Sequence, residues 1–172
     1  MLRLSATIID RPIISLRSGG PLGMALDPII NPHNLKILGW WVDERGHPEK
    51  RVLLIEDIRR MTDDGLMVDS EESLVLPEEL VRLKEILATN WALMGKQVKT
   101  KRQKLGKVTD YSYNDGMFVQ KLYVGVPIVK MLSSTNTLLI DRTQIVEVTD
   151  HYIMVRDTEV TEGAEMPAAL PA

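Results

Sequence analysis

The sequence predicts a mainly β protein made of two similar small domains that are joined by one α-helix. Short runs rich in Leu, Ile and Val alternate with tight-turn sequences along most of the 172 residues. Several short matches recur in the same order after an offset of about 85 positions. Between the two copies, one stretch has apolar residues at helical spacing. Many short strands joined by tight turns are typical of a small sandwich or barrel.

The internal repeat is recognised from its order. The offset between matching pairs grows from 83 to 85 to 87 along the chain and never decreases. Two diverged copies with short loop insertions give this pattern, whereas chance matches are not expected to stay collinear. The matches are Leu22-Gly23 with Leu105-Gly106, Leu53-Leu54-Ile55 with Leu138-Leu139-Ile140, and Met67-Val68 with Met154-Val155. We therefore expect two domains, at residues 1–73 and 93–157.

Each copy has its own series of strand-like runs. Gly, Pro, Asn and Asp separate these runs, because those residues favour the backbone angles of turns. In the first copy the expected strands are Pro12–Leu16, Met24–Ile30, Leu35–Asp43 and Arg51–Ile55. In the second copy they are Gln97–Lys99, Lys107–Tyr113, Phe118–Val124, Thr137–Asp141 and Tyr152–Val155. Asn114-Asp115-Gly116 is a hairpin-type turn.

A helix is expected at Pro77–Thr89, within a linker at residues 74–92. Proline suits a first helical position, and Glu78 and Glu79 complement the positive end of the helix. Leu80, Leu83 and Leu87 recur at helical spacing and give one apolar face. The last residues, 158–172, contain three Glu and no Lys or Arg, and we expect them to form a disordered acidic tail.

Two collinear sets of motifs resemble the PRC-barrel family. In the second copy the motifs are Met94–Val98, Lys104–Asp110 and Ile145–Asp150; in the first they are Arg11–Leu16, Pro21–Ala25 and Ile58–Asp63. Similar barrels occur in the photosynthetic reaction-centre H subunit and in the C-terminal half of a bacterial maturation factor of the small ribosomal subunit. The resemblance implies two PRC-type β-barrels in tandem over about residues 5 to 156. It implies docking, assembly or regulatory roles and no catalytic residues.

Composition excludes several classes of site. The absence of cysteine excludes thiolate chemistry, disulfides and cysteine-ligated metal sites. The three histidines lie in turn sequences without metal-ligand spacing, and the Gly-rich run Ser18–Gly23 lacks the ending of a phosphate-binding loop. No apolar run approaches the length of a membrane helix. We therefore expect a cytoplasmic protein that is not an enzyme, has no cofactor or metal and does not insert into a membrane.

A strongly basic segment stands out against the net charge of −3. Six basic residues occur within twelve positions that contain no acid, namely Lys96, Lys99, Lys101, Arg102, Lys104 and Lys107. Clustered Lys and Arg bind phosphate groups or acidic protein surfaces through charge. The alternative is a solvated hairpin whose charges protect a strand edge from aggregation.

The adjacent pair Trp40-Trp41 is the second candidate for partner binding. Successive residues of a strand point to opposite faces, so one ring enters the core and the other is either covered or exposed. An exposed Trp would suit a partner interface, whereas burial under the helix or the second copy would make the pair structural.

Together these features predict a non-enzymatic adaptor or assembly module that docks a protein partner or another copy of itself. In this hypothesis the basic segment steers an acidic partner and an outward Trp supplies apolar contact. The alternative is an RNA-associated or ribosome-associated maturation factor that uses the region Lys96–Lys107.

Overall fold

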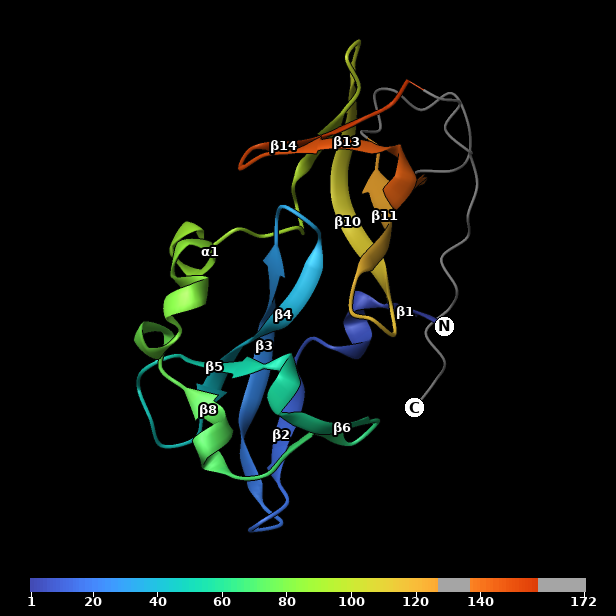
Figure 1. The fold of residues 1–172 in the computed structure, drawn as a ribbon. Coiled ribbons are helices and arrows are strands. Elements are labelled where there is room, and N and C mark those ends of the chain that lie inside the picture. Colours follow the sequence, from blue (N-terminus) through green and yellow to red (C-terminus); the bar gives the residue numbers. More distant parts are fainter. Residues whose placement is uncertain (127–136, 158–172) are drawn as a thin grey trace. The chain divides into compact units, whose positions relative to one another are not determined.

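The structure, a computed structural model, describes residues 1–126 and 137–157 and is mainly β, which confirms the expected class (Figure 1). The chain divides into two compact units. The first comprises Met1–Ala92 and Tyr113–Val119, and the second comprises Leu93–Ser112 and the residues from Gln120 onward. The expected linker thus belongs to the first unit. The expected disordered tail lies outside the described residues.

The first unit contains one twisted sheet. Its strands follow the order β6-β7-β2-β3-β4-β5-β8. Their bounds are β2 Arg11–Ser15, β3 Pro21–Asn31, β4 Lys36–Glu44, β5 Arg51–Leu54, β6 Ile58–Thr62, β7 Gly65–Val68 and β8 Leu74–Val75. The short β1, Leu2–Leu4, is not a strand of this sheet. The segment Tyr113–Val119 joins this unit through backbone hydrogen bonds, from Ile37 to Met117 at 2.8 Å and from Val119 to Leu35 at 3.0 Å.

The sheet of the second unit follows the order β12-β11-β10-β9-β14-β13. Its strands are β9 Gln97–Lys99, β10 Lys104–Asn114, β11 Val119–Gly125, β12 Thr137–Asp141, β13 Ile145–Val148 and β14 Tyr152–Val155. Read in the opposite direction, β13-β14-β9-β10-β11-β12, this order matches the first six strands of the first sheet, β6-β7-β2-β3-β4-β5. The equivalent strands β3 and β10 are both 11 residues long and begin at Pro21 and Lys104, 83 positions apart. The repeat expected from the sequence is therefore a repeat of strand order.

Both sheets are curled by the same parallel pairing. In each unit one central strand pairs in parallel with a strand from later in the unit, β2 with β7 and β9 with β14, while its other neighbour is antiparallel. At the centre, Ile13 lies opposite Gly23 on one side and Leu66 on the other. In the second unit, Val98 lies opposite Gly106 and Ile153. Ile13 and Val98 are both fully buried.

The glycines at this junction allow close backbone packing. A Cβ on Gly106 would overlap the carbonyl oxygen of Gly125, and one on Gly23 would overlap that of Asp43. The side chain of any other residue would therefore push apart the strand pairs β10–β11 and β3–β4. The repeated Leu-Gly pair thus marks, in each unit, a close approach of neighbouring strands.

The closed barrels expected from the sequence are not shown. Strand pairs among the described residues leave β6 and β8 at the ends of the first sheet, and β12 and β13 at the ends of the second. The described residues of each unit thus form a curled sheet with two free ends.

The expected continuous helix over Pro77–Thr89 is wrong in its first part. Pro77–Glu79 and Val81–Leu83 form separate 3₁₀ turns, and only Lys84–Thr89 is α-helical, as α1. Leu80 interrupts the segment because its φ of −90° and ψ of 65° lie outside the helical region. The apolar face was predicted correctly, since Leu80, Leu83 and Leu87 pack on the sheet of the first unit.

Replacing Gly106 with Ala should destabilise the second unit strongly. The new methyl group meets backbone that cannot yield without separating β10 from β11. We expect a loss of roughly 2–4 kcal/mol in unfolding free energy, measured by urea denaturation. Gly20→Ala is the control, because the nearest atom to a Cβ there is the Ser18 hydroxyl at 3.7 Å. Equal stability of the two variants would show that β10 tolerates a side chain at this crossing.

Candidate functional site

The six basic residues of the sequence prediction surround one hairpin of the second unit. The hairpin joins β9 to β10 and projects beyond β13 and β14 (Figure 1). Its turn residues Lys101 and Arg102 are exposed, as are Lys104 and Lys107 on β10. Lys96 and Lys99 are half-buried. We call the exposed set Lys101, Arg102, Lys104 and Lys107 the basic hairpin.

The turn of the basic hairpin is held by one buried threonine. Thr100 is 6% exposed, and its hydroxyl accepts hydrogen bonds from the backbone N–H groups of Arg102, at 3.1 Å, and Gln103, at 3.2 Å. The backbone N–H of Thr100 donates to the Gln103 carbonyl at 2.8 Å. These bonds satisfy the turn backbone locally. Lys101 and Arg102 are therefore presented from an ordered turn.

A β-bulge brings the lysines of β10 to one face. Lys104 lies opposite Lys99, Gly106 opposite Val98 and Lys107 opposite Gln97, so that one extra residue is inserted between Lys104 and Gly106. In a regular strand, positions 104 and 107 would point to opposite faces. The bulge shifts the alternation by one and places both on the side of Lys99.

The two remaining lysines contact the second unit itself. The Lys99 ammonium lies 3.5 Å from the centre of the Tyr152 ring, within cation–π range. Lys96 Nζ donates a hydrogen bond to the Asp150 carbonyl at 2.7 Å. Partial burial lowers the pKa of Lys96 from its ordinary value, and the charge of Asp150 opposes this shift. Lys96 and Lys99 thus anchor the hairpin to β14 and the turn before it.

A small groove lies beside the basic hairpin, with a volume of about 260 Å³. Its lining combines apolar and charged residues, namely Lys101, Val146, Met154, Val155, Arg156 and Asp157. Val146, at the bulge of β13, is 54% exposed. The Arg102 guanidinium lies 3.5 Å from the Asp157 carboxylate. The sequence prediction missed Arg156, because this residue does not lie in a cluster of basic residues. Arg156 directly follows β14, and the parallel pairing of β14 with β9 brings β14 beside the hairpin.

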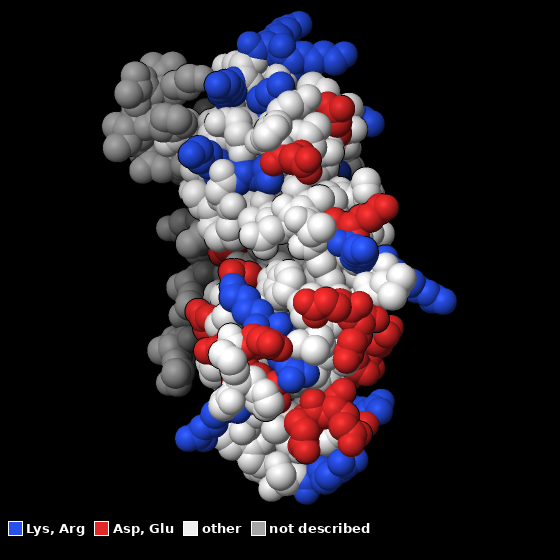
Figure 2. All heavy atoms as spheres, turned by 90° about the vertical axis from the view of Figure 1, so that its left-hand side faces the viewer, with Lys and Arg blue, Asp and Glu red and all other residues white. Residues whose placement is uncertain are grey.

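The two units differ in charge. The first carries 11 Lys and Arg against 16 Asp and Glu, whereas the described residues of the second carry nine against five. Figure 2 shows basic side chains gathered at the end where the hairpin projects, and acidic ones on the first unit around β8 and the helical turns. The acidic residues there include Glu71, Glu72, Glu78, Glu79 and Glu85. The described part of the second unit is thus the basic half of the molecule.

The two tryptophans lie on opposite faces of β4, as expected. Trp40 is fully buried, so its ring belongs to the core. Trp41 is half-buried and packs with the cluster of Ile29, Val52 and Leu87 under the helical segment. Both tryptophans belong to the first unit, whereas the basic hairpin belongs to the second. The burial of Trp41 under the helical segment corresponds to the structural alternative.

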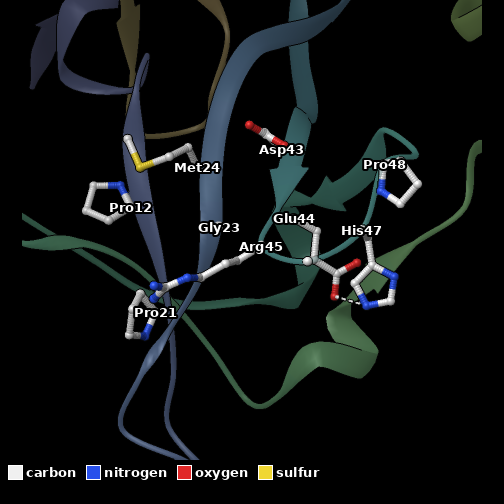
Figure 3. Close-up of a pocket in the computed structure, with 10 residues that line it drawn as sticks. Pro12, Pro21, Gly23, Met24, Asp43, Glu44, Arg45, His47 and Pro48 are labelled. Carbon is white, nitrogen blue, oxygen red and sulfur yellow. Dashed lines mark ion pairs between the residues drawn. The ribbon is translucent and has the colours of Figure 1, made fainter.

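A second, larger groove lies on the first unit, with a volume of about 680 Å³ (Figure 3). Its rim includes Pro12, Pro21 and Met24, and the Arg45 side chain extends toward Pro21. In its wall the Glu44 carboxylate is only 10% exposed and forms an ion pair with Arg51 Nε at 3.0 Å. This pair ties the end of β4 to the start of β5. Its geometry indicates a structural role for Glu44.

Within residues 1–126 and 137–157, no group of three or more His, Asp or Glu side chains is arranged to hold a metal ion. None of the helices in the same residues has the length and apolarity to cross a membrane. In comparisons with known proteins, no family model and no curated protein matched the chain.

Thr100→Ala should loosen the basic hairpin without unfolding the unit. The substitution removes the acceptor of the Arg102 and Gln103 amides, a loss of about 0.5–2 kcal/mol of local stability. Hydrogen exchange at those two amides should accelerate, while exchange at Val98 stays slow. Thr100→Ser keeps the hydroxyl and serves as control. Unchanged exchange in the Ala variant would mean that the hydroxyl does not hold the turn.

Trp41→Ala should destabilise the first unit by about 3 kcal/mol, because the helical segment loses the ring on which it packs. The measurement is the free energy of unfolding in urea. Val81→Ala is the control, since Val81 is 77% exposed in the same segment. A change below about 1 kcal/mol for Trp41 would instead support the partner-binding interpretation of this residue.

Proposed function

We propose that the chain is a non-enzymatic, cytoplasmic adaptor of the PRC-barrel type, with two barrels in tandem, that docks an acidic protein partner through the basic hairpin. The observation that carries the proposal is the ordered projection of Lys101, Arg102, Lys104 and Lys107 on one short hairpin. The repeated strand order of the two sheets supports the tandem barrels.

Charge and order together favour docking. A projecting cluster of positive charge on the basic half of the molecule attracts an acidic surface during approach and limits the orientations that can bind. The local hydrogen bonds of Thr100 and the anchoring of Lys96 and Lys99 reduce the entropy lost when the hairpin binds. These features support a preformed binding element, in which the bulge gathers charge on one face.

A protein partner is favoured over RNA because of where the aromatic residues lie. Single-stranded RNA is held mainly by bases stacked on exposed aromatic rings. Tyr111 is fully buried, Tyr123 is 7% exposed, and the Lys99 ammonium occupies one face of the half-buried Tyr152 ring. The described residues around the basic hairpin thus offer more exposed positive charge than open aromatic surface. RNA binding is therefore the alternative hypothesis, and the binding experiment below includes RNA as a competing probe.

The test measures binding of the full chain to poly-L-glutamate, with single-stranded and double-stranded RNA as the competing probes. Lys101→Glu/Lys107→Glu should weaken poly-glutamate binding at least about tenfold at low salt, by repulsion in place of attraction. The matched control, Lys50→Glu/Lys84→Glu, makes the same change of charge at exposed lysines of the first unit and should bind nearly as the native chain does.

The result separates the hypotheses. An equal loss in both double variants would show that only overall charge matters and would contradict a hairpin site. Tighter binding to RNA than to poly-glutamate, lost in the Lys101→Glu/Lys107→Glu variant, would favour the RNA-associated role instead.

A further inference from the structure

The groove beside the basic hairpin has a lining that fits an acidic segment carrying apolar side chains. Val146, Met154 and Val155 supply apolar surface, while Lys101 and Arg156 supply positive charge at its edge. Its volume of about 260 Å³ suits one or two aliphatic side chains and is below the range of ordinary small-ligand pockets. The groove lies within the second unit and includes Lys101 of the basic hairpin.

The chain itself leads from this groove into such a segment. Asp157, the last described residue, lines the groove, and its carboxylate lies 3.5 Å from Arg102 of the hairpin. The fifteen residues that follow contain Glu159, Glu162 and Glu165, with Val160 and Met166 between and after them, and no Lys or Arg. Their charge and composition complement those of the groove.

We propose that residues 158–172 bind in cis to this groove and to the basic hairpin, and so compete with the acidic partner. The proposal rests on the proposed function, since it assigns a regulator to the same site. A segment attached at Asp157 is present at an effective concentration in the millimolar range, so even weak contacts keep it bound. A partner then binds only by displacing it, which lowers the apparent affinity by the fraction of chains whose site is open.

The direct test uses the absence of cysteine from the chain. A nitroxide label on Ala168→Cys, in the full chain, reports contact through broadening of backbone amide signals. We expect selective broadening at Lys101, Val146 and Met154. The matched variant adds Glu159→Gln, Glu162→Gln and Glu165→Gln to the same labelled chain and should lose this selectivity. Equal broadening in both chains would overturn the proposal.

A second measurement separates this proposal from the proposed function. A fluorescent peptide of residues 158–172 should bind the unlabelled triple Gln chain at least about fivefold more tightly than the native chain, whose site its own segment occupies. Equal affinity for both chains contradicts cis binding and leaves the docking function in place. Failure of both the peptide and poly-L-glutamate to bind either chain contradicts both proposals.

Discussion

The parallel pairing of β2 with β7 in the first unit, and of β9 with β14 in the second, is the interaction on which the rest of the structure depends. It brings β7 beside β2 and β14 beside β9, across most of the length of each unit. A buried branched side chain, Ile13 or Val98, occupies the junction, and a glycine opposite it admits a neighbouring backbone. The curl of each sheet depends on this pairing of a glycine with a branched residue, Gly23 with Ile13 in the first unit and Gly106 with Val98 in the second.

The candidate site follows from this pairing in the second unit. Because β9 is only three residues long and lies between β10 and β14, its hairpin is supported on both sides at its base. Tyr152 of β14 receives Lys99, and Arg156 after β14 reaches the groove that Lys101 lines. The bulge in β10 then turns Lys104 and Lys107 to the face of Lys99. Strand pairing in the second unit thus brings together basic residues that lie far apart in the sequence, and these residues form the candidate docking site.

The strands could be predicted from the sequence because local signals define them. Turn residues bound the runs that became β2 to β5 and β9 to β12 within a few positions, and the repeat gave their equivalence. β6 and β7 were not distinguished, since Ile58–Thr62 contains two arginines and lacks clear alternation. The break at Leu80 was missed because helical spacing of leucines persists through a 3₁₀ turn and reports the apolar face, not the backbone angles.

The sequence located only the part of the candidate site that is marked by a local signal. Six basic residues close in sequence gave the hairpin, but Arg156 and Val146 are about 50 positions away and join it only through strand pairing. Sequence proximity also grouped Lys96 and Lys99 with the exposed residues, although the fold directs them to the Asp150 carbonyl and the Tyr152 ring. Bulges and long-range pairing decide which charges are presented, and neither leaves a local pattern.

The most direct test of docking through the basic hairpin is a map of amide chemical shifts of the full chain during titration with poly-L-glutamate. The account predicts that the largest changes fall on Lys99–Lys104, Lys107 and Arg156, and that they vanish at high salt. Changes centred on the first unit, or none at binding concentrations, would contradict it.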